Sequence, residues 1–140
     1  LLDFGIGRWL DTEESGHGAD RKHPRGMMTL AYASPEQLRG EPMTTASDVF
    51  ALGVLLHEML TGERPWDIEG LDPVETATKV TSIPARRPST IAVDPGRRSR
   101  LQGDLDAVIM RALAPEPRDR YGSAHEFVED LYLFRRHLPV

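Results

Sequence analysis

Cysteine is absent from this chain of 140 residues. Its absence excludes disulfide bonds, thiolate zinc sites and cysteine nucleophiles, and it is compatible with a reducing compartment. An excess of basic charge is also absent, because the formal net charge is -5. Nucleic acids and anionic membranes both favour a basic partner, so neither is expected here. The chain also lacks a long hydrophobic run. Its longest nearly uncharged stretch, Val49 to Leu56, is too short to span a bilayer.

What is present is typical of one modest globular domain. Charged residues make up 28% of the chain and hydrophobic residues 39%. The first residues, Leu1 and Leu2, include neither an initiator Met nor a positively charged segment of the kind that opens a signal peptide. We therefore expect the chain to be a fragment of a longer protein.

Two short motifs bracket the first quarter of the chain. Asp3-Phe4-Gly5 stands near the start, and Ser34-Pro35-Glu36 follows after a long interval. Residues 6–33 contain four Gly, scattered charges and no sustained apolar period, which predicts a loop. A loop of that length is uncommon unless it is functional or disordered. Taken alone, Asp-Phe-Gly fits an acidic turn after a strand equally well.

The remaining pattern predicts a mainly helical fold. Ser34 with Gln37 forms a capping signal for a short helix, and Pro35 suits its first position. The segment from Ser47 to Leu60 predicts the strongest helix, capped by Ser47 and ended by Gly62. Apolar residues cover nearly its whole circumference, so we expect a central helix buried on all sides.

Three further helices are predicted after it. Asp72-Pro73 opens one, Asp104 caps one that runs through Leu113, and Ser123 with Glu126 caps the last. The apolar stripe of the last helix comprises Phe127, Leu131, Phe134 and Leu138. Residues 82–100 hold three Pro and five Arg, which predicts an extended surface connection.

Five ordered segments carry a family resemblance. They are Leu-Leu-Asp-Phe-Gly at 1–5, Thr-Leu-Ala-Tyr-Ala-Ser-Pro-Glu at 29–36, Asp-Val-Phe-Ala-Leu-Gly at 48–53, Thr-Gly-Glu-Arg-Pro-Trp at 61–66 and Arg-Asp-Arg-Tyr at 118–121. In order and spacing they resemble the large lobe of a eukaryotic-like serine/threonine protein kinase, most of all the bacterial branch. The resemblance implies a partial kinase domain over residues 1–138. Its activation segment is 3–36 and its helical lobe 37–138, with the small lobe and the catalytic loop absent.

The resemblance assigns roles to the residues of the activation segment. Asp3 corresponds to the carboxylate that holds the Mg²⁺ ion of Mg-ATP. Asp3 is therefore the residue expected to bind the metal and the cofactor. Phe4 and Gly5 correspond to the residues that switch between active and inactive arrangements. Thr29 corresponds to the loop that receives the substrate. Met28 stands where such kinases usually have Gly.

Glu36, Arg120 and Asp48 are the expected structural residues. Glu36 corresponds to a glutamate that pairs with a distant arginine, for which Arg120 is the counterpart, and the pair would clamp the end of the activation segment onto later helices. A solvated charge is the alternative for Arg120. Asp48 corresponds to an aspartate that binds amides of the catalytic loop, and it also suits the positive end of the helix dipole.

Thr12 and Ser15 are the candidate regulatory residues. A phosphate on either could order the loop through nearby Arg or Lys, although an exposed hydroxyl residue in a polar loop often only aids solubility. Phosphopeptide mapping of active protein that finds neither residue modified would end this hypothesis.

The resemblance implies transfer of the γ-phosphate of ATP to Ser or Thr of protein substrates, with ATP and Mg²⁺ as cofactors in the intact domain. No catalytic residue is expected within this chain, so we expect it to be inactive without the amino-terminal half of the domain. No nucleic acid partner and no membrane span are expected. The expected location is cytoplasmic, with a membrane tether in the intact protein left open. The alternative is a kinase-like scaffold that only binds a partner.

Overall fold

The computed structural model describes residues 30–140, and these residues are helical with no strand among them. The predictions for Asp3, Phe4, Gly5, Thr12, Ser15 and Thr29 lie outside the described residues. The helices are α3 (Pro35–Leu38), α4 (Thr45–Thr61), α5 (Pro73–Ser82), α6 (Pro88–Ile91), α7 (Pro95–Leu101), α8 (Asp104–Ala112) and α9 (Ala124–Arg135), with a short 3-10 turn, η1 (Pro117–Asp119). The expected mainly helical class is confirmed.

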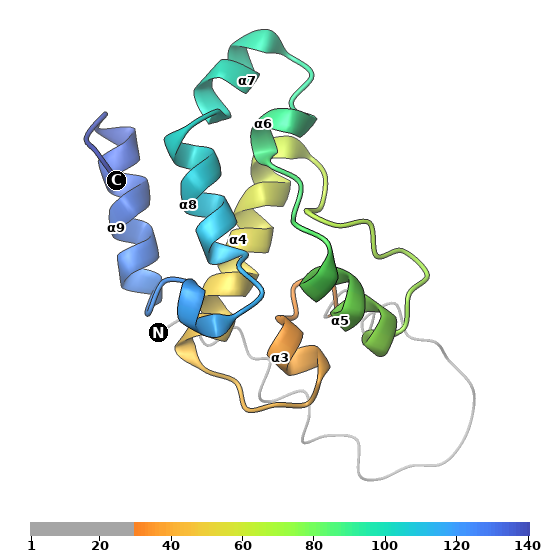
Figure 1. Cartoon of the computed structure of the whole chain (residues 1–140). Coiled ribbons are helices and arrows are strands. Elements are labelled where there is room, and N and C mark those ends of the chain that lie inside the picture. The colour runs from red at the N-terminus through yellow and green to blue at the C-terminus, as the bar shows by residue number, and fades with distance from the viewer. Residues whose placement is uncertain (1–29) are drawn as a thin grey trace, which may run out of the picture.

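The longest helix, α4, organises the rest. It packs against α8, α9 and α6, while α3 packs against α5 (Figure 1). Phe50 and Val54 of α4 join Ile109 and Leu113 in one buried cluster, and Val49 lies in a second cluster with Tyr121. At Gly53 an added Cβ would lie 2.9 Å from the Cβ of Ala112. The close approach of α4 and α8 therefore depends on a residue without a side chain.

The start of α4 differs from the prediction. The helix begins at Thr45 and not at Ser47, and the cap position belongs to Thr44, whose N–H donates to Ser47 Oγ. Ser47 is thus the third residue of the helix, where its hydroxyl donates to Glu36. The predicted cap was wrong because a serine inside the first turn can also hydrogen-bond to a residue distant in sequence, here Glu36.

The expected burial of α4 on all sides was also wrong. Leu55 is 39% exposed and Met59 is 71% exposed. These side chains lie on the face of α4 away from its buried residues Phe50, Val54 and His57. Apolar composition around a helix shows what could be buried, whereas neighbouring elements decide what is buried.

The predicted extended connection over residues 82–100 was wrong as well. Two short helices, α6 and α7, lie there, and each has Pro at its first position. Asp94 caps α7 by accepting from the N–H of Arg97 at 2.7 Å. Proline breaks a helix only in its interior, and at the first position its fixed φ angle favours helix formation.

The other predicted helix starts agree with the structure to within one residue. Ser34 and Gln37 form the capping box of α3, and Asp72 forms that of α5 with Glu75. Helix α8 begins at Asp104, so the cap position falls on Gly103. Ser123 caps α9, but Glu126 accepts from the N–H of Gly122 at 3.0 Å and not from that of Ser123.

Candidate functional site

A buried ion pair joins α3 to the residue that follows η1. Arg120 is 3% exposed and Glu36 is 3% exposed. The guanidinium donates to both carboxylate oxygens of Glu36, from Nη1 to Oε1 at 2.6 Å and from Nη2 to Oε2 at 2.9 Å. Two parallel charge-assisted bonds fix both the distance and the plane of the pair. The structure thus brings Glu36 and Arg120 together across 84 positions of sequence.

The remaining donors of Arg120 are also satisfied. The guanidinium donates to the backbone carbonyls of Ala46, Ala114 and Pro115 at 3.0, 2.7 and 2.9 Å. Together with the two bonds to Glu36, these contacts occupy the five N–H donors of an arginine. Burial of a charge is costly unless it is paired and fully hydrogen-bonded, and this site meets both conditions. Arg120 therefore connects α3, the start of α4 and the loop after α8.

The carboxylate of Glu36 is held in its ionised form. Burial alone would raise the pKa of Glu36, but hydrogen bonds from Arg120, its own backbone N–H and Ser47, with the positive charge of Arg120, outweigh burial and lower the pKa from 4.5 to about 2. The Ser47 hydroxyl donates to Oε1 at 2.8 Å.

We expect this pair to lose its contribution to stability in acid. Because the pKa of Glu36 is lower in the folded chain, the stabilisation is fully present above pH 4.5 and is lost as the pH falls toward about 2. A pKa lowered from 4.5 to about 2 on folding corresponds to about 3 kcal/mol of stability. Urea unfolding at a series of pH values, with the chain compared to Glu36→Gln, measures this contribution. Between pH 4.5 and about 2, the unfolding free energy of Glu36→Gln should fall by about 3 kcal/mol less than that of the unchanged chain. Equal falls in the two proteins would contradict the proposed role of the Glu36 carboxylate.

A second contact ties the same segment to the other end of α4. Tyr32 donates from its hydroxyl to Glu58 Oε2 at 2.9 Å. This hydrogen bond to a carboxylate is the main reason that the pKa of Tyr32 is raised. Ser47 and Glu58 are 11 positions apart, or about 16 Å along the helix. Residues 32–36 are therefore anchored at two points along α4.

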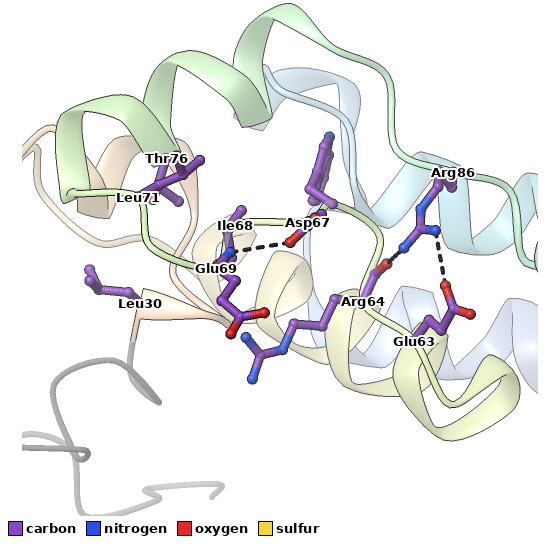
Figure 2. Close-up of a pocket in the computed structure, with 10 residues that line it drawn as sticks. Leu30, Glu63, Arg64, Asp67, Ile68, Glu69, Leu71, Thr76 and Arg86 are labelled. Atoms are coloured by element: carbon purple, nitrogen blue, oxygen red, sulfur yellow. Dashed lines mark hydrogen bonds and ion pairs between the residues drawn. The ribbon is translucent and has the colours of Figure 1, made fainter.

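A pocket of about 600 Å³ lies beside these anchored residues (Figure 2). Leu30 lines one side, and the loop that follows α4 supplies Arg64, Trp66 and Ile68. The pocket and the ion pair are in continuous contact through aromatic rings. Arg120 lies 4.9 Å over the ring of Phe50, and Phe50 stacks on Trp66 with ring centroids 5.8 Å apart.

Sequence patterns did not indicate several of these residues. Tyr32, Glu58 and the pocket-lining Trp66 lay within or beside quoted motifs, yet no local signal linked them to one another. Asp48, which the sequence did single out, is exposed in the first turn of α4, where its charge complements the helix dipole. Its hydrogen bonds to a catalytic loop stay a prediction. Within the described part of the chain, no three His, Asp or Glu side chains gather closely enough to hold a metal ion.

The buried helix α4, the Glu-Arg pair and the anchored segment define a lobe of the protein kinase type. Residues 1–133 match the protein kinase domain, and the chain belongs to this family. It is 38% identical over 136 residues to a probable serine/threonine-protein kinase, CE0033, of Corynebacterium efficiens, covering 97% of this chain and 20% of that protein. It is also 38% identical over 131 residues to the serine/threonine-protein kinase PknB of Mycobacterium tuberculosis, covering 94% and 19%.

Solved structures agree with this assignment. The twitchin kinase region from C. elegans is similar with a TM-score of 0.54 and 27% identity, covering 75% of this chain and 17% of that one. The kinase PK-1 of Cydia pomonella granulovirus has the same fold, with a TM-score of 0.57 at 24% identity, over 74% and 36% of the two chains. The chain spans about a fifth of the length of the curated relatives it matches. Across residues 30–140, no helix combines the length and apolar character that a bilayer crossing requires.

Proposed function

We propose that this chain forms part of a serine/threonine protein kinase that acts on protein substrates. The observation that carries the proposal is the buried pair of Glu36 and Arg120, because it fixes the carboxyl end of the predicted activation segment to the helical lobe. The curated relatives bear the names of serine/threonine kinases. In the reaction, a Ser or Thr hydroxyl oxygen attacks the γ-phosphorus of ATP, ADP leaves, and the hydroxyl proton passes to a base.

Each part of the chain has one task in this proposal. Asp3 supplies a hard carboxylate oxygen for Mg²⁺. This ion usually takes only one or two carboxylate ligands from a protein, together with oxygens of the substrate phosphates. Mg-ATP, when bound, supplies the phosphoryl group and the charge neutralisation. Thr29 belongs to the loop that receives the substrate, and Leu30 after it lines the pocket. Tyr32 and Glu36 anchor the residues that follow Thr29 to α4.

The base, the ATP-binding lysine and the glycine-rich loop of a kinase have no match among these 140 residues. We propose that they come from a preceding half of the domain, with which this chain packs in the intact protein. A cytoplasmic location for the catalytic domain follows from its need for ATP, and a membrane tether elsewhere in the protein is compatible with it.

The test compares this chain with a longer protein that also contains the preceding half of the domain. Each is incubated with Mg-ATP, and labelled phosphate on a protein substrate is measured. We expect transfer only by the longer protein. Transfer by the chain alone would contradict the division of tasks proposed here. Absence of transfer by the longer protein, together with retained binding of a partner, would favour the scaffold, which is the second candidate.

A further inference from the structure

The pocket beside Leu30 has an apolar base. Trp66, Ile68 and Leu71 line it together with Leu30, as Figure 2 shows for the residues that it labels. Trp66 is buried, and its indole N–H donates to the backbone oxygen of Ile83 at 2.7 Å, which fixes the ring. Three aliphatic side chains and one indole thus form a surface that favours an apolar occupant.

The base continues inward as a narrow extension. A second cavity shares Leu30, Trp66 and Ile68 with the pocket and reaches Phe50 and Val80 of the core. Its volume of about 10 Å³ is roughly the space of one water molecule. The outer pocket, at about 600 Å³, lies within the usual size range of ligand sites. The room for a partner is therefore in the outer pocket, above an apolar base.

The rim of the pocket carries unpaired charge. It contains three carboxylates, of Glu63, Asp67 and Glu69, and the two guanidinium groups of Arg64 and Arg86. Arg86 donates to Glu63 at 2.9 Å, so these two charges offset each other. Among residues 30–140, no ion pair involves Asp67, Glu69 or Arg64. Two carboxylates and one guanidinium are therefore left for a partner.

The surrounding segment is acidic as well. Residues 63–79 contain five acidic and two basic residues, and all five acidic residues are exposed. One of the two basic residues, Lys79, donates to the backbone oxygen of Asp67 and takes part in no ion pair within the described range. An excess of negative charge at the mouth of a pocket attracts a cationic partner.

We propose that this pocket is a docking site for the protein substrate, occupied by a segment in which a leucine-sized apolar side chain lies next to a lysine or arginine. The apolar side chain packs on the base formed by Leu30, Ile68 and Leu71. The cationic group lies against the exposed carboxylates of Asp67 and Glu69. Such a site holds the substrate near the lobe and so raises its effective concentration.

The location of the pocket points to the substrate as the partner. Leu30 directly follows Thr29, which belongs to the loop expected to receive the substrate. From Leu30 the pocket extends to Leu71 and to Thr76 of α5. A bound segment therefore lies between that loop and α5. This choice of partner rests on the proposed function, whereas binding to the pocket requires no phosphate transfer.

Four fluorescently labelled peptides test the apolar and the charged part of the proposal separately. They share glycine residues at both ends and carry Lys-Leu-Lys, Lys-Ala-Lys, Glu-Leu-Glu or Glu-Ala-Glu at the centre. Fluorescence anisotropy measures their affinity for the chain. We expect the Lys-Leu-Lys peptide to bind tightest and the Lys-Ala-Lys peptide to bind about tenfold more weakly, because a buried leucine is lost. The Glu-Leu-Glu peptide should bind at least about fivefold more weakly than Lys-Leu-Lys.

The peptides leave the protein unchanged, so their comparison does not depend on the folding of a variant. Equal affinities for the leucine and alanine peptides, or for the lysine and glutamate peptides, would overturn the proposal. The absence of saturable binding by the Lys-Leu-Lys peptide would overturn it as well.

Variants at the rim should shift the affinity for the Lys-Leu-Lys peptide in opposite directions. Glu69→Gln should weaken binding about two- to fivefold, and Arg64→Gln should strengthen it by a similar factor, because both side chains are exposed at the rim. Glu129→Gln is the matched control, since Glu129 is exposed on α9. Unchanged affinity in both rim variants, or an equal change in Glu129→Gln, would contradict the charge complementarity.

A variant at the base tests the apolar contact from the side of the protein. Leu71→Ser should weaken binding of the Lys-Leu-Lys peptide at least about fivefold and that of the Lys-Ala-Lys peptide much less. Val93→Ser is the matched control, because Val93 is 90% exposed and does not line the pocket. Circular dichroism confirms that each variant keeps its helices. Equal losses for Leu71→Ser and Val93→Ser would overturn the assignment of the base.

The docking site and the proposed function fail in different ways. Phosphate transfer by the longer protein without discrimination among the four peptides would overturn the docking site and leave the proposed function intact. Discrimination among the peptides without phosphate transfer would support the site and contradict the proposed function.

Discussion

Replacement of Arg120 by Ala is expected to remove a large part of the stability of the lobe. The substitution leaves the Glu36 carboxylate buried without its partner and deprives the carbonyls of Ala46, Ala114 and Pro115 of a donor. Breaking a buried ion pair from one side costs about 3–5 kcal/mol. Domains of this kind are stable by only about 5–15 kcal/mol, so the loss is a large part of the total. The free energy of urea unfolding measures it.

Two comparison variants make the result specific. Arg118→Ala removes the same side chain two positions earlier, where it is exposed, and should change stability by no more than about 0.5 kcal/mol. Arg120→Lys keeps the charge but offers three donors in place of five, so its stability should fall between the two. Equal stabilities for Arg120→Ala and Arg118→Ala would show that the pair does not hold the lobe together.

A double substitution distinguishes the cost of leaving one charge unpaired from the cost of losing the hydrogen bonds to the backbone carbonyls. Glu36→Leu combined with Arg120→Met removes both charges, so no unpaired carboxylate is left behind. This double variant should be more stable than Arg120→Ala alone. It should still fall short of the unchanged chain, because the three carbonyl groups lose their donor in both variants.

The second large effect is expected for Asp3→Asn in a longer protein that includes the preceding half of the domain. If Asp3 holds Mg²⁺ as proposed, loss of its charge removes several kcal/mol of transition-state stabilisation, or roughly a thousandfold in rate. The initial rate of phosphate transfer at saturating Mg-ATP measures the loss. Glu129→Gln is a control of the same chemistry at an exposed position of α9 and should leave the rate unchanged.

Measurement of unfolding distinguishes a loss of metal binding in Asp3→Asn from a general loss of folding. Asp3→Asn should unfold at the same urea concentration as the unchanged protein, because the proposed role is in the chemistry. A rate within a few fold of the unchanged protein would exclude Asp3 as the metal ligand. An equal loss for Glu129→Gln would point to damage unrelated to the metal.

Local chemistry accounts for the features that the sequence predicted well. The capping boxes at Ser34 and Asp72 involve residues three positions apart, so their hydrogen bonds depend on the local chain alone. The end of α4 at Gly62, with a φ of 76°, is equally local, because a left-handed residue at this position is usually glycine. The same local rules failed over residues 82–100, where proline starts two helices and does not break them.

The site depended on more than local chemistry. Glu36 and Arg120 were linked through a family resemblance, since residues 84 positions apart carry no signal of their contact in one sequence. Nothing in the sequence around Leu30 marks the pocket, because the rest of its lining comes from residues 63–86. The two segments meet only in the folded chain, so sequence pattern cannot reveal the pocket.

The sequence by itself determined the family, the helical class and most helix starts, because these depend on residue order and on hydrogen bonds within a turn. Only the tertiary structure decided that Leu55 and Met59 of α4 are exposed, that all five donors of Arg120 are satisfied, and that Leu30 shares a pocket with the loop after α4. The physical reason is that burial and long-range hydrogen bonding belong to pairs of segments. Those pairs form only when the chain has packed.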